Sequence, residues 1–205
     1  KGSTSLDLMW DSEFTGPTWN FSWIRKANVM IDRITNNMSG ILTEEQYNHW
    51  LGIGRFFRGL EYARLVNVFG DVPYYGTELL NTDKDEIYKD RTPRNEVMDQ
   101  VYEDFDFAMN HVRKHDIDAQ HVNQYVVAAF VSRWALFEAS WQKYHYDNDA
   151  QAKKFFELAV TAAEIVMDSG KFDIDTDFRS LFGSTKPTKE SVFYRLYNAE
   201  KGITH

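Results

Sequence analysis

Cysteine is absent from this chain of 205 residues. Its absence excludes disulfides, thiol nucleophiles and cysteine-ligated metals, and it leaves the redox compartment open. Long apolar runs are missing as well, because none reaches the roughly 18 residues that a membrane-spanning helix needs. The first residues also show no signal-peptide pattern. A membrane span is therefore not expected in these residues.

Basic residues are the minority charge, with 23 Lys and Arg against 31 Asp and Glu and a net charge of -8. Phosphate contacts need clustered Lys and Arg, so a nucleic-acid partner or an anionic membrane surface is not expected. The composition is 43% hydrophobic and 16% aromatic. This excludes a disordered tail and predicts a globular chain with a real core.

Motifs of catalysis and metal binding are also missing. His111 and His115 lie four residues apart without an HExxH motif, so a solvated helix face is the simpler interpretation. Residues 147–149 lack the Gly and the distal Glu of a calcium loop, and a cap and turn explain them better. No nucleophile motif or Gly-rich phosphate loop is present. We therefore predict no enzyme activity, no cofactor and no metal.

A long amphipathic helix with an abrupt exit is the feature around which the chain is organised. It begins near Tyr47, and Gly70 suits a left-handed cap while Pro73 prevents continuation. The exit loop that follows, up to Tyr75, is therefore predicted to be fixed in shape. Large apolar residues recur at steps of three and four along the helix, and we predict that the face they form is buried: Trp50, Ile53, Phe57 and Leu60. Further large residues widen the apolar stripe, so packing on two sides of the helix is expected: Phe56, Tyr62, Leu65, Val66 and Phe69.

Further helices are expected from the same periodicity. They cover residues 22–38, a segment beginning at 92–93 with Thr92 as its cap, residues 122–144, and a segment capped by Asp149 and ended by Ser169 and Gly170. The last has the small, aromatic, small spacing of a tetratricopeptide second helix. Four tryptophans fall in these helices and are predicted to be core residues: Trp23, Trp50, Trp134 and Trp141.

The segments between the helices are expected to be long loops. Residues 76–91 are acidic and polar, which predicts a solvated loop. Residues 191–197 alternate in a way that predicts a short strand. The predicted fold is therefore all-α, built from stacked antiparallel helix pairs in a tetratricopeptide-like arrangement, with long loops and a short terminal strand.

Several motifs of the chain resemble one known family. The runs Arg55–Gly59 and Phe69–Pro73 are similar to the "FlRA…fGDvP" signature of the SusD/RagB family of bacterial outer-membrane glycan-binding lipoproteins. Other family landmarks follow in order, including Phe21, Ile24 and Asn28 of an earlier helix and the later run "SGKFDI…DFRSLF…ESVFYRLYN". The resemblance extends over roughly residues 21 to 198, and it matches only the amino-terminal part of the family fold.

The resemblance implies a non-catalytic protein that is exposed on the surface of the outer membrane through a lipid anchor. It implies capture of oligosaccharides or polysaccharides and their delivery to a SusC-type TonB-dependent transporter, on which the protein closes as a lid. The only membrane contact would be the anchor, which these residues do not contain. The start at Lys1 and the stop at His205, just after the strand-like run, indicate a piece of a longer protein.

Three segments follow from this interpretation. Residues 1–21 form an opening loop with possible ligand contacts, residues 22–190 form the SusD-like helical domain, and residues 191–205 begin a missing ligand-bearing region. Trp10 and Trp19, beside Asn20, lie outside any helical period. Sugar rings stack on indole while their hydroxyls need planar donors and acceptors, so these three residues are candidate ligand contacts. Tyr74 and Tyr75 in the exit loop are similar candidates.

Each of these assignments has an alternative. The two loop tryptophans could instead plug the edge of the domain, and the two tyrosines could be structural. A tetratricopeptide adaptor that binds peptide segments would use the same helices. A helical glycoside hydrolase would use aromatics together with two carboxylates. Glycan binding without product release separates the first interpretation from the hydrolase, and binding of peptide but not sugar selects the adaptor.

Overall fold

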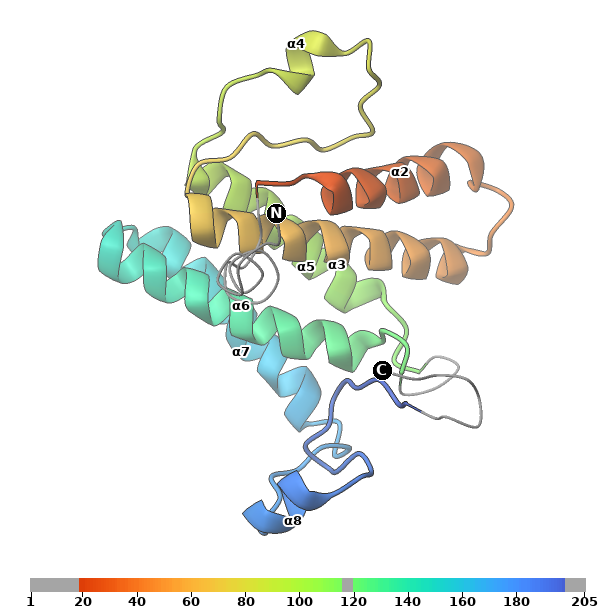
Figure 1. Ribbon diagram of the computed structural model, residues 1–205, viewed down its shortest axis with the longest axis vertical. Coiled ribbons are helices and arrows are strands. Elements are labelled where there is room, and N and C mark those ends of the chain that lie inside the picture. The colour runs from red at the N-terminus through yellow and green to blue at the C-terminus, as the bar shows by residue number, and fades with distance from the viewer. Residues whose placement is uncertain (1–18, 116–119, 198–205) are drawn as a thin grey trace, which may run out of the picture. The chain divides into compact units, whose positions relative to one another are not determined.

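The computed structural model describes residues 19–115 and 120–197, and these residues are organised as helices joined by loops (Figure 1). The helices within this part of the chain are α2 (Ser22–Asn37), α3 (Glu44–Phe69), α4 (Lys84–Ile87), α5 (Arg94–His111), α6 (Gln124–His145), α7 (Asp149–Met167) and α8 (Phe178–Gly183). The fold is therefore all-α, as predicted. In the described ranges, no helix combines the length and the apolarity that crossing a membrane requires.

The chain divides into two compact units, Lys1–Ala108 and Met109–His205. In the first unit, α2 and α3 run antiparallel as a hairpin (Figure 1). The inner side of α2 is apolar at steps of three and four, and four residues of the predicted stripe are buried: Ile24, Ala27, Ile31 and Ile34. Met38, predicted as the last residue of the stripe, is exposed just beyond the helix. Gly54 allows α3 to approach closely, because a Cβ there would lie 2.9 Å from Cγ1 of Ile31.

Helix α3 begins three residues earlier than the sequence indicated. Thr43 and Gln46 form a capping box, in which the Thr43 hydroxyl accepts from the Gln46 amide and the Gln46 side chain accepts from the Thr43 amide. This arrangement satisfies two backbone donors at once. The other end is as predicted, since Gly70 takes a positive φ of 69° at the cap.

The face predicted from the spacing of three and four is not the inner face of α3, although most of the residues predicted to widen it are buried. Trp50 and Phe57 are each 42% exposed, whereas Phe56 is only 2% exposed. The inner face instead includes the small residues of the helix. At Gly59 the backbone of α3 lies against α5, and a Cβ added to Gly59 would be 3.0 Å from Cε1 of Phe105. Large residues on the same side complete it: Tyr62, Leu65 and Val66.

The assignment of all helical tryptophans to the core is also wrong. Trp23 on α2 is 63% exposed, with the Nζ of Lys26 lying 3.9 Å from its ring centroid. Trp134 and Trp141 on α6 are half-buried. A tryptophan can pack along a helix surface and still keep much of its ring in solvent, so helical position alone does not place it inside.

Helix α5 has the buried stripe that its periodicity predicted: Met98, Val101, Phe105, Ala108 and Val112. Its first turn is capped differently. The carboxylate of Asp71 accepts a hydrogen bond of 2.8 Å from the Arg94 amide. Thr92 was predicted as the cap, but its hydroxyl instead accepts from the Tyr74 amide. The start of α5 is thereby tied to the exit loop of α3.

In the second unit, α6 and α7 pack against each other as an antiparallel pair (Figure 1). Asn123 caps α6 by accepting from the amides of Tyr125 and Val126. Asn148 caps α7 by accepting from the Gln151 amide, so the predicted cap at Asp149 is off by one residue. Small buried residues bring the two helices close: Ala128, Ala135, Ala139, Ala159 and Ala162.

The carboxy-terminal part of the described chain is irregular apart from α8. Asp177 caps α8 by accepting from the amides of Arg179 and Ser180. The strand predicted over residues 191–197 is not formed. A strand needs a neighbour to satisfy its backbone groups. The described ranges contain only one isolated antiparallel bridge, between Val72 and Thr92.

Candidate functional site

The loop that leaves α3 returns to its own base before α5 begins. The Thr92 amide donates to the Val72 carbonyl at 3.0 Å, and this bridge closes residues 73–91 into a loop. The Asp71 contact with the start of α5 holds the same base from the other side. The loop carries α4 and runs along α2 (Figure 1). The loop is therefore held at both of its ends.

A buried ion pair lies beneath this loop. Arg58 of α3 is 8% exposed and makes two hydrogen bonds to the Asp104 carboxylate of α5, at 2.7 and 2.8 Å. Arg55 donates to the same carboxylate at 2.8 Å. Burial alone would lower the pKa of Arg58, but the hydrogen bonds and the charge of Asp104 together outweigh it and raise that pKa above its usual value. The guanidinium therefore stays charged.

The same guanidinium reaches the loop. Its Nη1 donates to the Gly76 carbonyl at 2.7 Å and to Oδ1 of Asn28 at 3.2 Å. The Asn28 amide in turn donates to the carbonyls of Tyr75 and Thr77, at 2.8 and 3.0 Å. We call Asn28, Arg58 and Asp104 the anchor. The anchor fixes three consecutive loop carbonyls from α2, α3 and α5.

Tyr62 adds a further constraint on the loop. Its hydroxyl accepts from the Tyr75 amide at 2.6 Å and donates to the Tyr75 carbonyl at 3.1 Å. Burial raises the pKa of the Tyr62 phenol well above its usual value. The hydroxyl therefore remains protonated and can keep both roles. The backbone at Tyr75 is held on both of its polar groups.

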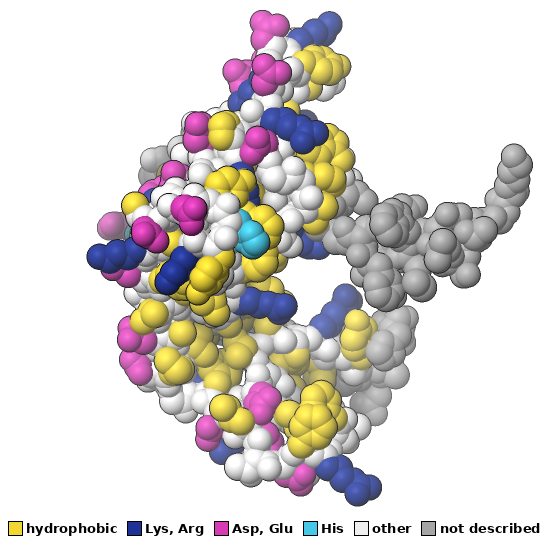
Figure 2. Space-filling model, turned by 90° about the vertical axis from the view of Figure 1, so that its left-hand side faces the viewer, with side chains coloured by type: hydrophobic (Ala, Val, Ile, Leu, Met, Phe, Trp, Pro, Cys, Tyr) yellow, Lys and Arg dark blue, Asp and Glu magenta, His cyan; other side chains and the backbone are white. Residues whose placement is uncertain are grey.

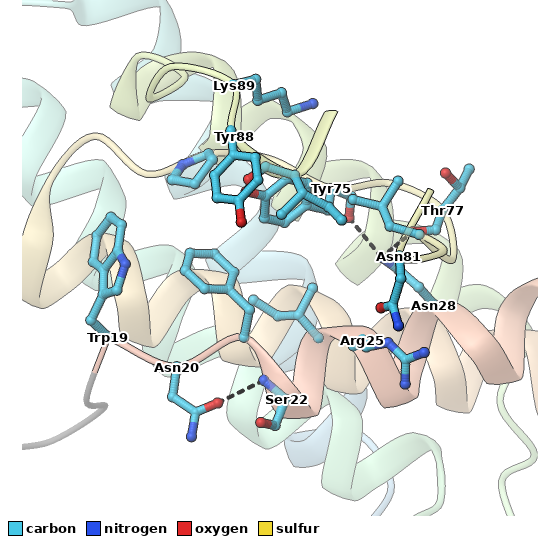
Figure 3. Close-up of a pocket in the computed structure, with 15 residues that line it drawn as sticks. Trp19, Asn20, Ser22, Arg25, Asn28, Tyr75, Thr77, Asn81, Tyr88 and Lys89 are labelled. Atoms are coloured by element: carbon cyan, nitrogen blue, oxygen red, sulfur yellow. Dashed lines mark hydrogen bonds between the residues drawn. The ribbon is translucent and has the colours of Figure 1, made fainter. Parts of the chain in front are cut away.

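Above the anchor, the loop and the amino-terminal end of α2 enclose a pocket of about 660 Å³ (Figure 3). One wall comes from α2 and the residues before it: Trp19, Asn20, Phe21, Ser22, Ile24, Arg25 and Asn28. The other wall comes from the loop: Pro73, Tyr75, Thr77, Leu79, Asn81, Ile87, Tyr88 and Lys89. The volume lies in the range of small-molecule sites, which are clefts of roughly 300–1,000 Å³.

Aromatic rings form a continuous row along the pocket. The ring centroid of Phe21 lies 5.5 Å from that of Trp19 and 5.4 Å from that of Tyr75, both edge to face. Trp19 is 47% exposed and also contacts Phe69 edge to face at 5.1 Å. Tyr88 is 82% exposed at the opposite side of the opening (Figure 3). Exposed ring area is therefore available on both walls.

Polar side chains also line the pocket. Oδ1 of Asn20 accepts from the Ser22 amide at 2.8 Å, which leaves its NH2 group without a partner among the described residues. The side chain of Asn81 is exposed and likewise makes no hydrogen bond within the described ranges. The Tyr75 hydroxyl donates to the Ile87 carbonyl at 2.9 Å. Burial raises the pKa of Tyr75, and the charge of Glu86 adds to the rise.

The predicted site residues have different positions. Trp19, Asn20 and Tyr75 line this one pocket. Tyr74 does not line it, because its ring packs against Tyr62 at 4.8 Å, and burial raises the pKa of its phenol. Trp10 lies outside the described residues. Tyr88 also lines the pocket and was not predicted, because it stands alone in a segment whose composition indicated a solvated loop.

The family is established by comparison. A model of SusD-like proteins described as "Starch-binding associating with outer membrane" matches residues 7–136, more than half of the chain. The chain therefore belongs to the SusD-like family of starch-binding proteins that associate with the outer membrane. No curated protein matches it. The motifs that carried the resemblance now have a structural meaning, since Arg58, Asp71 and Asn28 hold the loop and its base.

Solved structures share the fold at low sequence identity. A SusD-like protein from Bacteroides fragilis matches with a TM-score of 0.64 and 19% identity, over 83% of this chain and 31% of its own. A SusD superfamily protein from Parabacteroides distasonis gives 0.63 and 21%, over 77% and 32%. A laminarin-binding SusD-like protein gives 0.62 and 18%, over 83% and 34%. The chain thus spans about a third of the length of the solved structures it matches.

Proposed function

We propose that this chain is part of a non-catalytic glycan-binding protein of the bacterial cell surface, and that the pocket between α2 and the 73–91 loop contacts the glycan. Family membership and the pocket's chemistry support the proposal. Relatives of the same fold include one that is named for laminarin binding and one whose structure contains a xylogluco-oligosaccharide. The observation that carries the proposal is that partly exposed rings and polar side chains line one pocket.

The pocket meets both needs of a sugar. The apolar face of a pyranose stacks on an aromatic ring, and Trp19 and Tyr88 offer exposed ring surface. Sugar hydroxyls need donors and acceptors that are not already used within the protein, and Asn20 and Asn81 offer amides. The opening is broad rather than enclosed, with Trp19 and Tyr88 on opposite walls (Figure 3). An oligosaccharide can therefore lie across it without threading.

The composition of the pocket also supports binding without reaction. Hydrolysis of a glycosidic bond uses a pair of carboxylates at roughly 5–9.5 Å. The described lining contains neither Asp nor Glu, so a hydrolase mechanism would have to draw on other residues. Stacking contributes only about 0.5–1.5 kcal/mol per ring beyond the buried area, which suits weak capture and easy release.

The intact protein, in this proposal, is held to the outer membrane by a lipid anchor and passes its glycan to a SusC-type TonB-dependent transporter. The helical region of residues 22–190 would supply the docking surface, since helix pairs make a rigid scaffold. Co-purification of the full-length protein with the transporter tests this step. Removal of the helical region should abolish the association, and an association that survives the removal would contradict it.

The glycan site is tested with Trp19→Ala in the full-length protein, measured by calorimetry against a panel of oligosaccharides. We expect about a tenfold loss of affinity, which corresponds to roughly 1.4 kcal/mol. Trp23→Ala is the matched control, because it removes an exposed indole of α2 that lies outside the pocket lining. Its affinity should equal that of the wild type. The bound glycan should be recovered without cleavage, which separates binding from hydrolysis.

Two results would count against the site. Equal affinity of Trp19→Ala and the wild type, with an unchanged thermal melt, would remove Trp19 from the glycan contact. A collapsed melt of Trp19→Ala would instead assign this ring to the edge of the core, where it contacts Phe69. In that case Tyr88→Ala provides the decisive measurement, because Tyr88 is far more exposed.

A further inference from the structure

We propose that the pocket selects glycans that carry an anionic group, a uronate carboxylate or a sulfate. This inference rests on the proposed glycan-binding function and narrows its ligand class. The chain as a whole is acidic, with a net charge of -8. The described pocket lining has the opposite balance, with Arg25 and Lys89 as cations and no Asp or Glu. Elsewhere, on the face shown in Figure 2, acidic and basic side chains are interspersed.

Arg25 is the stronger of the two cations as a ligand contact. It is exposed, and within the described residues its guanidinium makes no hydrogen bond or ion pair. A guanidinium presents donors in a planar fork that matches a carboxylate or a sulfate on two oxygens. Arg25 belongs to the α2 wall of the pocket and is seen beside Asn81 (Figure 3). A ligand anion would therefore supply the partner that the protein does not.

Lys89 contributes less, because part of its charge is already compensated. Its Nζ lies 2.9 Å from the Glu86 carboxylate and 5.3 Å from the centroid of the Tyr75 ring. It stands on the loop wall, opposite Arg25 (Figure 3). The two cations thus mark both sides of the opening, and the unpaired one is expected to dominate selection.

The acidic residues of the loop are engaged elsewhere or lie in solvent. Glu78 pairs with Arg33 at 3.9 Å, and Asp83 accepts from the Leu80 amide at 2.8 Å. Asp85 and Asp90 are exposed outside the lining, where water and salt weaken their field. Arg91 adds positive charge at the same end, 4.8 Å from the centroid of the Trp19 ring.

The amino-terminal end of α2 adds positive electrostatic potential at the pocket. Its first turn contains no acidic residue, and its cap residue Phe21 offers no side-chain hydrogen bond. The first amides of a helix carry a partial positive charge that favours anions. Arg25 follows within the same turn of α2, at the pocket. In this proposal Arg25 and Lys89 provide most of the preference for an anionic glycan, and the amino-terminal end of α2 adds to it.

The test uses the full-length protein and oligosaccharides that differ only at C6. Maltohexaose, cellohexaose and laminarihexaose are each compared with the counterpart whose C6 groups are oxidised to carboxylates, and a sulfated counterpart distinguishes sulfate from uronate. Affinities are measured by calorimetry at about 50 and 500 mM salt. We expect at least one anionic probe to bind about tenfold more tightly than its neutral partner, with the advantage reduced at high salt.

Arg25→Gln should remove most of that advantage, so that the anionic probe and its neutral partner bind the variant with similar affinities. Lys26→Gln is the matched control, because it removes one positive charge from the adjacent residue of α2, outside the lining. It should preserve the preference. If every neutral probe that binds does so as tightly as its anionic counterparts, or if the two variants have equal effects, the inference is overturned while glycan binding stays intact. Failure of every probe to bind would overturn both proposals.

Discussion

The anchor and the exposed part of the pocket hold the same loop in opposite ways. The anchor of Asn28, Arg58 and Asp104 is buried and grips loop carbonyls from below. The residues that we call the rim, Trp19, Arg25 and Tyr88, are exposed and face the opening. The anchor thus sets the shape of the loop, whereas the rim offers the contacts to a ligand. Backbone position is set from inside by buried groups, of which only Asn28 also lines the pocket, so the rim can change without loss of the loop.

Asp104→Asn should have the largest effect on stability. Removing this charge leaves Arg58 buried without its partner, and Arg55 half-buried beside it. Breaking a buried ion pair on one side costs roughly 3–5 kcal/mol. Urea unfolding of the variant and the wild type measures the loss. Glu61→Gln is the control, because its pair with Arg64 is partly exposed and should contribute less than about 1 kcal/mol.

A loss below about 1 kcal/mol in Asp104→Asn would contradict the role of the anchor. Equal losses in the Asp104 and Glu61 variants would show that burial does not distinguish these two ion pairs.

Phe56→Ala and Phe57→Ala compare the two sides of α3 through adjacent residues. Phe56 is almost fully buried and lies 6.5 Å from the Phe105 ring, so its removal should leave a cavity and cost roughly 3–5 kcal/mol. Phe57 is 42% exposed, so its removal should cost about 1 kcal/mol in this chain. Denaturant melts of both variants check the difference, and a reversed order would restore the face that periodicity favoured.

Tyr62→Phe should change how stability depends on pH. Because the folded pKa of Tyr62 is raised above the ordinary 10.0, the folded protein binds more protons than the unfolded chain in alkaline solution. The stabilisation is thus fully present below pH 10 and is lost as pH rises. Tyr62→Phe should lose roughly 1–3 kcal/mol near neutrality from its broken hydrogen bonds. Its free energy of unfolding should then fall less steeply between pH 9 and pH 11.

Parallel pH slopes for Tyr62→Phe and the wild type would show that Tyr62 ionises normally. Tyr75 lines the pocket, so a measurement of glycan affinity in Tyr62→Phe also tests whether a loosened loop weakens binding.

Tyr88→Ala should have the smallest effect on stability, within about 0.5 kcal/mol, because the side chain is 82% exposed. Its effect on glycan affinity should be several-fold, since it removes a stacking surface worth about 0.5–1.5 kcal/mol. Calorimetry measures the affinity, and a thermal melt measures the stability. Tyr144→Ala on α6 is a control with a similarly exposed ring outside the lining. A destabilised Tyr88→Ala with unchanged affinity would place Tyr88 in the scaffold.

The sequence predicted the helices well and the inner face of α3 poorly. Helix existence follows from caps and periodicity, and the predicted end at Gly70 and stripe of α5 are confirmed. Around α3, however, large apolar residues lie on nearly every side, so a spacing of three and four fits more than one face. The informative signal in α3 was its glycines. Gly54 marks where α2 approaches α3, and Gly59 marks where α5 approaches it, because a Cβ at either position would crowd the neighbouring helix.

The site was predicted in part for a similar reason. Trp19 and Asn20 precede α2, and their outward position follows from lying outside its period. Tyr74 and Tyr75 were indistinguishable in sequence, but neighbours in an extended segment point to opposite sides, and only Tyr75 reaches the pocket. Tyr88 and Arg25 become site residues only when the loop folds back onto α2. No local pattern encodes that juxtaposition.

The two hydrogen bonds of the Tyr62 hydroxyl have a consequence for the exchange of protons with solvent. They satisfy the amide and the carbonyl of Tyr75 as an adjacent strand would, although a single side chain provides both. An amide held in this way exchanges only when the surrounding helices open together. The Tyr75 amide should thus exchange as slowly as the interior of α3 despite lying in a loop. The NMR signal of this amide should therefore report whether the hydrogen bonds between Tyr62 and Tyr75 stay intact while a glycan is added.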